Sequence, residues 1–502
     1  MAFVIPHILT LILFFPVLGG VVILAMPAAK VKLIRGLALG TSLIPFILSL
    51  VAWATFNMAA TGFQFEEKIA WYPAIGSFYH LGIDGISLTM MLLTTLLTPL
   101  AILASYSIVD RVKAYMVLFL FLETGMLGVF LSLDLLLFFV FWEVGLVPMY
   151  FLINQWGGAN RNYASLKFIL FTMTGSLGLL LAIQMLGVVA GTYDLPALTA
   201  AWTHLSGSLF GLSIGTVKTI AFWAFVIAFA IKVPVWPFHT WLPDAHTEAP
   251  TAASMLLAGV LLKLGAYGFL RLVIPLYPVE SQRFAASLAA LATMGIIFGA
   301  LGALGQNDFK RLVAYSSISH MGFVILGIAA AAWAAGTENA RIAMNGAVLQ
   351  MVNQGLSAAG MFFLVGVLYE RTHTRDLKAY GGLFPIVPIY GGMLLFTAMG
   401  SLGLPGLGGF VSEFMVVRGA WPIFTAAVAM GMIGLFFTGA YILKAIRDVL
   451  HGPLNETWLG HLTDIKPREM VVITPLIILM LSIGFWPAWI LDVINRTVSA
   501  LF

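Results

Sequence analysis

Cysteine is absent from this chain of 502 residues, and charged residues are scarce. The absence of cysteine excludes disulfides, thiolate zinc sites and iron–sulfur ligation. Asp, Glu, Lys and Arg together make up 9% of the chain and hydrophobic residues 61%, whereas soluble domains average about 25% charged and roughly 45–50% apolar residues. This balance excludes an ordinary soluble protein and predicts a chain embedded in a lipid bilayer.

Nucleotide-binding and metal-binding motifs are also missing. No G-x-G-x-x-G opens a predicted helix, there is no P-loop, and the nine histidines do not form paired ligands on facing helices. The net charge of +4 is no footprint for nucleic acid, because the basic residues mostly lie in short loops between apolar runs. We therefore predict no cofactor, no metal and no nucleic-acid partner for this chain, and no redox chemistry of its own.

Apolar runs of about 20 residues recur along the whole chain, and each can span roughly 30 Å of hydrocarbon. The first run lacks the basic flank of a cleaved signal, so we expect a retained helix. The pattern predicts an all-α polytopic membrane protein with about fourteen transmembrane helices. Their expected ranges are 3–24, 31–56, 82–105, 114–131, 135–155, 164–190, 218–236, 251–277, 284–304, 312–335, 341–368, 383–416, 423–447 and 469–495.

Lysine and arginine are distributed unevenly over the two sets of loop ends, sixteen against seven. The richer set holds Lys30, Lys32, Arg35, Arg111, Lys113, Arg161, Lys167, Lys310, Arg311, Arg371, Arg375, Lys378, Lys444, Arg447, Lys466 and Arg468. The poorer set holds Lys68, Lys218, Arg271, Arg283, Arg341, Arg418 and Arg496. Because cytoplasmic loops are enriched in basic residues, the richer set is expected in the cytoplasm and both termini outside it.

An internal repeat is visible at low resolution. The fourth helix begins near Ala114 and the ninth near Phe284, roughly 170 residues later, and Pro234 and Pro405 have about the same separation. A unit of five helices is odd, so the second copy must be inverted relative to the first. Inverted repeats with a helix broken at matching positions indicate a secondary-transporter site near the midplane, whereas the competing interpretation is that these prolines only kink packed helices. The expected divisions are 1–113, the first repeat 114–277, the inverted second repeat 284–447, and 448–502.

Five ionisable side chains lie inside the predicted spans: Glu123, Glu143, Lys232, Lys263 and Glu413. An ionised group at the bilayer centre costs at least roughly 2.5–3.5 kcal/mol on insertion scales. A chain with so few charged residues that nevertheless buries these five is expected to use them to move an ion.

Lys232 precedes Pro234 and Pro237, which remove two backbone donors and free nearby carbonyls. Free carbonyls at the C-terminal end of a half-helix favour an ammonium group. A buried lysine also needs a carboxylate nearby to keep its charge, and Glu143 is the natural partner. The alternative is a static ion pair that only holds two helices together.

Lys263 has no acidic residue within a helical turn on its own helix, and Tyr267 is the only polar side chain nearby on that face. Buried lysines change protonation state readily, so Lys263 is a candidate proton carrier. Glu413 follows the second predicted break and is the matching end of a path through the second repeat.

His320 has Ser316 and Ser317 on its face of the tenth helix. A lone helical histidine is usually a satisfied hydrogen-bonding group, but the hydroxyls and the acids on other helices make a proton relay equally plausible. Gln350, Asn353 and Gln354 in the eleventh helix could either bond helices together or line water.

Glu123 is the weakest of the five buried candidates and could face a helix of this chain or a neighbouring subunit. Residues 237–250 contain His239, Asp244, His246 and Glu248. Their spacing matches no zinc signature and prolines interrupt the segment. We therefore expect a fixed cytoplasmic entrance with proton-exchanging groups at His239, His246 and Glu248.

Residues 232–250 and 307–322 closely resemble the antiporter-like membrane subunits of respiratory complex I, the proton-pumping NADH:quinone oxidoreductase. That family includes subunits of multisubunit sodium/proton antiporters and membrane-bound hydrogenases, and the resemblance covers nearly the whole chain. Two features resemble its chain M type, the bacterial counterpart of mitochondrial NADH dehydrogenase subunit 4. Glu413 stands where the sister chains usually carry lysine, and no long lateral helix is expected after the fourteenth helix.

The resemblance implies Glu143 and Lys232 as a modulating pair, Lys263 as central carrier, His320 as connecting group and Glu413 as the exit-side group. It also implies that flavin mononucleotide, iron–sulfur clusters and quinone are bound by other subunits, and that the homologous chains L and N are neighbours. A bacterial cytoplasmic membrane is the simplest expected location, with both termini outside on the lysine and arginine counts. A sodium/proton antiporter or hydrogenase subunit is the alternative function, and a purely structural membrane scaffold leaves the buried Lys263 unexplained.

Overall fold

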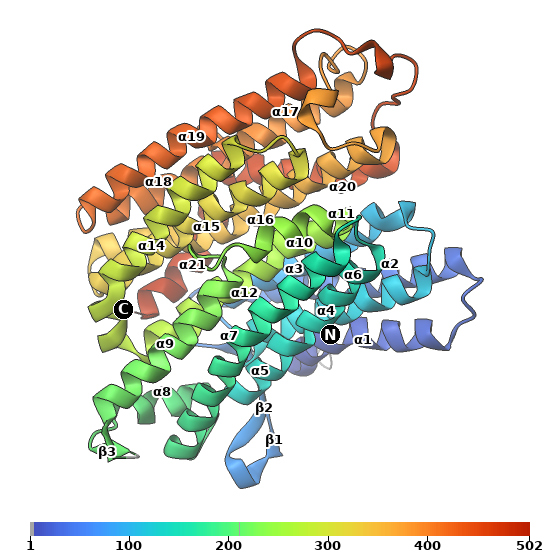
Figure 1. Ribbon diagram of the computed structural model, residues 1–502. Coiled ribbons are helices and arrows are strands. Elements are labelled where there is room, and N and C mark those ends of the chain that lie inside the picture. Colours follow the sequence, from blue (N-terminus) through green and yellow to red (C-terminus); the bar gives the residue numbers. More distant parts are fainter. Residues whose placement is uncertain (1–4, 210, 502) are drawn as a thin grey trace.

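The computed structural model describes residues 5–209 and 211–501; residues 3 and 4 of the first predicted helix lie outside them. The described chain contains thirteen helical segments long and apolar enough to cross a membrane, and they run side by side in one bundle (Figure 1). The predicted all-α polytopic fold is confirmed. The uninterrupted members are α1 (Ile8–Ala25), α2 (Val31–Thr55), α3 (Gly85–Ala104), α4 (Val112–Leu131), α7 (Arg161–Ala190), α9 (Ile214–Lys232), α14 (Pro278–Leu304), α15 (Phe309–Trp333), α16 (Glu338–Thr372), α19 (Thr425–Leu450) and α20 (Pro467–Phe485).

Two of the thirteen spans are composite. The first joins α5 (Leu135–Val144) to α6 (Leu146–Trp156) at Gly145. The second runs from Thr251 to Leu276 and changes its hydrogen-bond pattern four times. It comprises α11 (Thr251–Leu256), a π-helical segment (Leu257–Leu261), α12 (Leu262–Gly268), a second π-helical segment (Phe269–Val273) and α13 (Ile274–Leu276). Since π-helical turns are rare and occur frequently at functional sites, this span is marked out by its backbone alone.

Both predicted helix breaks are present. The first lies between the end of α9 at Lys232 and α10 (Trp241–Glu248). The second separates α17 (Pro388–Leu402) from α18 (Gly408–Ala420), two helices that are each too short to count among the thirteen spans. Gly403 begins the second break with a φ of +79°, a left-handed conformation that a residue with a Cβ rarely adopts. The inverted relation of the two repeats and the four divisions of the chain stay predictions.

Some expected boundaries were wrong. The helix over 469–495 is interrupted, because α20 ends at Phe485 and Pro487 precedes a separate helix, α21 (Ala488–Leu501). The helix over 218–236 ends four residues early at Lys232. Elements that the apolar runs did not reveal are the hairpin of β1 (Gln64–Tyr72) and β2 (Ser77–Ile83), the short helix α8 (Leu195–His204), and the two-residue strands β3 (Ser208–Leu209) and β4 (Leu212–Ser213).

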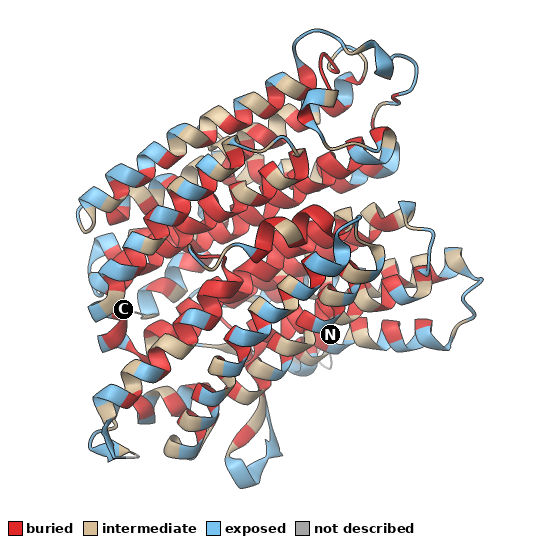
Figure 2. Ribbon diagram, in the orientation of Figure 1, coloured by how far each residue is buried: buried red, intermediate tan, exposed pale blue. Residues whose placement is uncertain are grey.

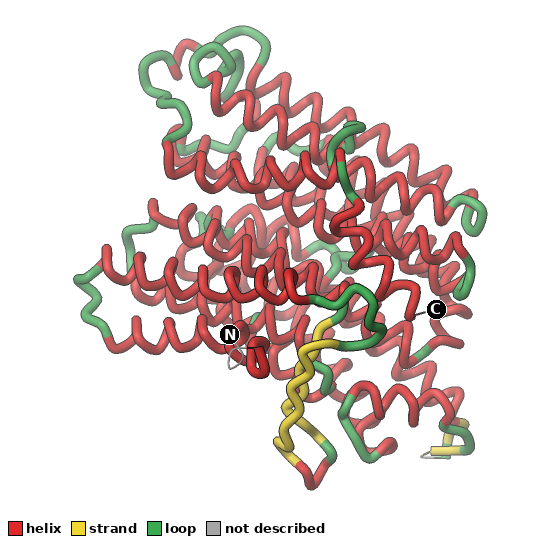
Figure 3. Tube along the Cα trace, turned by 180° about the vertical axis from the view of Figure 1, so that it is seen from behind, coloured by secondary structure: helices red, strands yellow, loops and turns green. Residues whose placement is uncertain are grey.

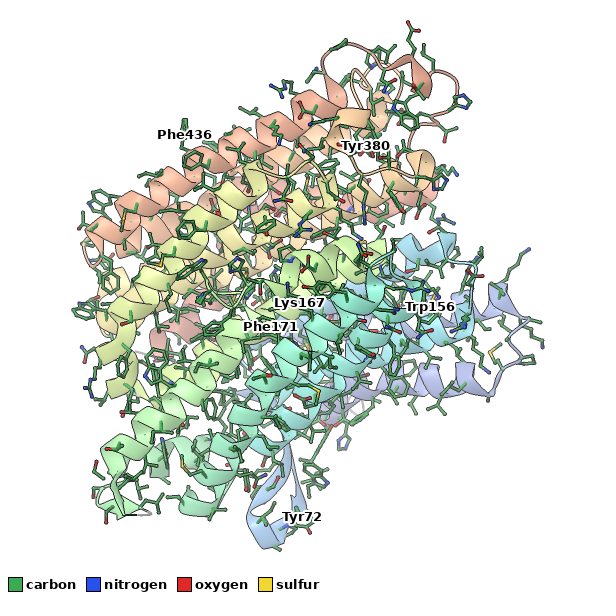
Figure 4. The ribbon with its side chains drawn as sticks, in the orientation of Figure 1. Tyr72, Trp156, Lys167, Phe171, Tyr380 and Phe436 are labelled. Carbon is green, nitrogen blue, oxygen red and sulfur yellow. The ribbon has the colours of Figure 1, made fainter. Side chains whose placement is uncertain are left out.

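The bundle has two ends that the site description needs. The hairpin end carries β1 and β2, which project from the helices (Figure 3), together with α8 and α21. The opposite, basic end carries the loops that follow α1 and α19 and the segment 233–250 between α9 and α11. In Figure 4, Tyr72 marks the tip of the hairpin and Tyr380 lies at the basic end.

Burial divides the helices into central and peripheral ones. The span Thr251–Leu276 and helix α16 are enclosed by other helices, whereas α1, α2 and α19 present apolar side chains outward (Figure 2). Phe436 on α19, for example, is 75% exposed and points away from the bundle (Figure 4). An apolar periphery of this kind is the surface that lipid covers, while the enclosed helices carry the buried polar groups described next.

Candidate proton pathway

Lys232 is 2% exposed and is the last residue of α9. Its Nζ lies 5.0 Å from the centre of the Trp142 ring, a cation–π distance. The end of α9 at this residue also offers carbonyl oxygens to a positive charge. The first predicted break therefore places an ammonium group at the C-terminal end of a half-helix, as its prolines suggested.

Among the ion pairs within 4.0 Å between described side chains, none links Glu143 to Lys232. The role of Glu143 as the partner of Lys232 stays a prediction. Glu143 Oε1 is buried and has no hydrogen-bond partner among the described residues. A carboxylate with an unused acceptor and an ammonium held by a ring face can both move, whereas a static ion pair cannot.

Lys263 is fully buried in α12, between the two π-helical segments. Its Nζ donates to the carbonyl of Ala258 and to Oε1 of Gln354 on α16. Ala258 lies inside the first π-helical segment, where the wider turn leaves a carbonyl for the side chain. Among the described residues, Lys263 thus bonds to two neutral acceptors and to no carboxylate, which is the arrangement expected of a group that can give up a proton.

The amides of α16 connect Lys263 to the second half of the bundle. Gln354 accepts from Lys263, and Gln350, one turn earlier on the same face, donates to Oε1 of Glu413 at 2.8 Å. Asn353 donates to the backbone oxygen of Gly408 at 2.7 Å and to the hydroxyl of Ser412 at 3.0 Å. The sequence left open whether these residues bond helices together or line water; the structure gives Gln350 and Gln354 contacts to the two charged groups themselves.

Glu413 and His320 form a buried hydrogen-bonded pair. Nδ1 of His320 lies 2.7 Å from Oε1 of Glu413, and both side chains are 6% exposed. Nε2 of His320 is buried and without a partner among the described residues. Ser316 and Ser317 bond instead to the carbonyl of Val313 on their own helix, so the hydroxyls that we expected to assist His320 do not. The partner of the histidine is the carboxylate of the second broken helix.

The segment between α9 and α11 places the predicted entrance groups at the basic end. Nδ1 of His239 and both ring nitrogens of His246 are buried without partners among the described residues. The ring of His246 stacks on Phe362, with ring centres 4.5 Å apart. Oε2 of Glu248 accepts from the backbone of Asn160 at 2.9 Å. The unused nitrogens of His246 mark it as a group that can accept or pass a proton.

A cavity of about 220 Å³ opens beside Glu248 at the basic end. Its charged lining consists of Glu248, Lys310, Glu370 and Arg375. Lys310 is 6% exposed and donates to the carbonyl of Ala249. Lys310 was expected among the loop charges, but it lies in the first turn of α15, the helix that carries His320, and is buried there. Among the described residues, no group of three His, Asp or Glu side chains is arranged to hold a metal ion.

Glu123 is fully buried in α4, and neither of its carboxylate oxygens has a partner among the described residues. Two residues further along α4, Gly125 packs against Gly145 so closely that a Cβ would lie 2.5 Å from the Gly145 nitrogen. Because residues two apart on a helix do not share a face, Glu123 points away from this contact. It faces the interior of this chain, and its role stays a prediction.

The buried groups and the broken helices define a class of protein: an antiporter-like membrane subunit with a polar pathway across two halves. A family profile described as "NADH:quinone oxidoreductase/Mrp antiporter, TM" matches residues 132–438, and one described as "NADH-ubiquinone oxidoreductase chain 4, amino terminus" matches residues 11–133. The first match covers more than half of the chain, so the chain belongs to this family. The resemblance seen in the sequence motifs is confirmed.

Individual relatives agree with this assignment. NADH-quinone oxidoreductase subunit M of Rhodobacter capsulatus is 40% identical over 99% of this chain and 96% of the relative. NAD(P)H-quinone oxidoreductase chain 4 1 of Synechococcus elongatus is 41% identical over 98% of this chain and 91% of the relative. Among solved structures, a chain of respiratory complex I from Thermus thermophilus with bound NADH matches with a TM-score of 0.87 at 28% identity, covering 98% of each chain. A chain of the Mrp complex from Dietzia sp. DQ12-45-1b shares the fold, with a TM-score of 0.82 at 20% identity over 99% of this chain and 97% of the other.

Proposed function

We propose that this chain moves protons across the membrane as a subunit of NADH:quinone oxidoreductase, driven by quinone reduction elsewhere in the complex. One observation carries the proposal: the buried groups form a series across both halves, from Lys232 through Lys263 and Gln354 to Glu413 and His320. The names of its relatives supply the driving reaction, since they are subunits of quinone oxidoreductases.

Proton entry takes place at the basic end, which we assign to the cytoplasm on the strength of its lysine and arginine excess. Glu248 and Lys310 line the cavity, and His246, two residues before Glu248, has ring nitrogens without partners among the described residues that can bind a proton. From there the proton reaches Lys263. Both termini then lie outside, and the membrane is a bacterial cytoplasmic membrane.

A change in the distance between Glu143 and Lys232 drives the proton onward. The two groups already lie apart in this structure, with Lys232 against the Trp142 ring. When the field of Glu143 weakens, burial favours neutral Lys232 and its proton passes toward Lys263. Release from Lys263 to Glu413 and His320 follows by way of water, with Gln354 and Gln350 holding the two charged ends. Against a membrane potential on the order of 200 mV, moving one charge requires about 4.6 kcal/mol.

The partners in this scheme are the other membrane subunits of the complex, in particular the homologous chains L and N. Flavin mononucleotide, iron–sulfur clusters and quinone are bound by other subunits, and this chain contributes the translocating part of the enzyme. The resemblance to complex I subunits and the multi-pass fold support this assignment.

The test is Glu143→Gln in membranes that carry the assembled complex, with assembly checked on a native gel. We expect NADH-driven quinone reduction and proton uptake to fall together, because the uncharged amide removes the field on Lys232. Glu456→Gln, in the loop after α19, is the matched control and should change neither activity. Unchanged proton uptake in the assembled Glu143→Gln complex contradicts the proposal; loss of sodium tolerance with normal NADH oxidation supports the antiporter alternative instead.

A further inference from the structure

A second series of polar side chains extends from α12 toward the hairpin end, and the proposed pathway does not use it. Tyr267 lies one turn beyond Lys263 on the same face of α12. Its hydroxyl donates to the carbonyl of Phe130 at 3.0 Å and lies 2.9 Å from the hydroxyl of Ser87. One turn further on, Nε of Arg271 donates to the same Tyr267 hydroxyl at 3.3 Å. These groups lie on the hairpin side of Lys263. No hydrogen bond among the described residues joins Tyr267 to Lys263, whose Nζ bonds to Ala258 and Gln354.

Arg271 ends this series of polar groups, in a buried ion pair with Asp84. The side chains of Arg271 and Asp84 are only 6% and 5% exposed, and Nη2 of the arginine is bonded to Oδ2 of the aspartate. The other oxygen, Oδ1, accepts from the backbone of Ile86 and Ser87 and so caps α3. The guanidinium also lies 4.8 Å from the centre of the Phe63 ring. Both oxygens of Asp84 are therefore occupied by donors.

A cavity of about 180 Å³ lies on the far side of this ion pair, at the hairpin end. Arg271 and Asp84 both line it, and so do Arg496 and Thr497 of α21. Among the described residues of its lining, Asp84 is the only acid. The ion pair thus separates the buried Tyr267 hydroxyl from space that lies at the outer surface, with two guanidinium groups on the outer approach.

The chemistry of the pair stops a proton here. A guanidinium group stays protonated in proteins and has no acceptor atom, so it cannot take up a proton and pass it on. Both oxygens of the Asp84 carboxylate already accept hydrogen bonds, from Arg271 and from two backbone N–H groups, so neither is free to receive a proton from Tyr267. We propose that Arg271 closes the hairpin end of the first half, so that a proton on Lys263 cannot leave directly and must cross to Glu413.

This inference rests on the proposed function, because it assigns the outlet of the same pathway. It also separates two roles that one ion pair can have. A purely structural pair requires both partners, since removing either one leaves a buried charge uncompensated. A proton barrier depends instead on whether Asp84 is free to accept: the aspartate becomes a relay only when the guanidinium is gone.

The experiment compares Arg271→Gln, Asp84→Asn and the double variant in the complete purified complex, reconstituted into liposomes with a pH-sensitive dye inside. Proton conductance is measured without NADH, after a potassium gradient and valinomycin impose a membrane potential. We expect Arg271→Gln to raise the proton conductance roughly tenfold, because the barrier to proton passage becomes lower. The same variant should lower the NADH-driven proton gradient while NADH oxidation continues. Asp84→Asn, which can still cap α3, and the double variant should stay as tight as the parent, because neither has a free carboxylate.

Three outcomes overturn the inference: a tight Arg271→Gln complex, equal leaks in all three variants, or a leak in Asp84→Asn alone. Equal leaks identify a structural brace. If Arg271→Gln does not assemble, Arg271→Ala/Asp84→Ala and Arg271→Ala are compared in its place, with a leak expected only where Asp84 remains. The passive measurement uses no NADH, so it is separate from the Glu143→Gln test of the proposed function. Adding Lys263→Gln to a leaking variant should close the leak, because the pathway then lacks its carrier.

Discussion

The two broken helices hold opposite charges by different means. At the first break, Lys232 is the last residue before the interruption and has a ring face and a helix end beside it. At the second break, Glu413 follows the interruption and its Oε1 receives hydrogen bonds from Gln350 and His320. One charge is held by diffuse interactions and the other by directed ones.

Under the proposed function, this difference makes Lys232 the site that changes and Glu413 the site that receives the proton. Ring faces and helix ends act over a range of geometries, so the Lys232 ammonium can shift toward or away from Glu143 without breaking a specific bond. Hydrogen bonds to a carboxylate depend steeply on distance and angle, so Glu413 stays in one place. A pump needs both: a group whose environment varies with the driving reaction, and a terminal group whose affinity for protons is fixed by its neighbours.

Lys232→Met should have the largest effect on proton translocation, because it removes the charge from the first broken helix and leaves only an apolar side chain there. We expect NADH-driven proton translocation in reconstituted liposomes to fall by at least about tenfold, one decade being about 1.4 kcal/mol in barrier height. The matched control is Lys444→Met: Lys444 donates to the carbonyls of Leu304 and Gln306 at the end of α14. Equal losses in the two variants would mean that any lost lysine damages the complex.

Gln350→Leu should have the next largest effect, because it removes one of the two directed bonds to Glu413. A hydrogen bond to a charged group contributes about 1.5–3 kcal/mol, so translocation should fall roughly tenfold or more.

At the first site, Trp142→Phe keeps a ring face near Lys232 and should reduce the rate only about threefold, within the range of cation–π contributions. Steady-state rates of both complexes, corrected for assembly, check the order. A larger effect of Trp142→Phe would reverse the comparison.

Much of this arrangement could be predicted from the sequence, for particular physical reasons. Apolar runs and prolines are local signals, so the spans and both breaks were predicted, and the charge of Lys232, Lys263 and Glu413 inside apolar runs marked them as candidates. The contact of Gln354 with Lys263 could not be predicted, because the two residues lie on different helices and are 91 positions apart in the chain. The hairpin was missed for a related reason: β1 is largely exposed and carries Glu66, Glu67 and Lys68, so no apolar run marks it.

The smallest effect is expected from a substitution at the hairpin end, at Asp194, a charged group outside the membrane-spanning segments. Burial opposes its ionisation, but hydrogen bonds from His80 at 2.6 Å and Lys68 at 3.0 Å lower the pKa of Asp194 below its ordinary value of 3.8. A lowered folded-state pKa stabilises the protein above the unfolded-state pKa, and this contribution is lost as the pH falls below about 3.8.

Asp194→Asn should therefore loosen the hairpin at pH 7 and leave proton translocation unchanged. Because Lys68 is 44% exposed, solvent screening limits the loss to about 1 kcal/mol or less. Hydrogen–deuterium exchange of the amides in 64–83 should quicken up to about fivefold, and the difference from the parent should shrink as the pH falls below 3.8. A loss of translocation in this variant would show that charges at the hairpin end take part in transport. The groups that move protons would then not be confined to the two broken helices and the residues around them.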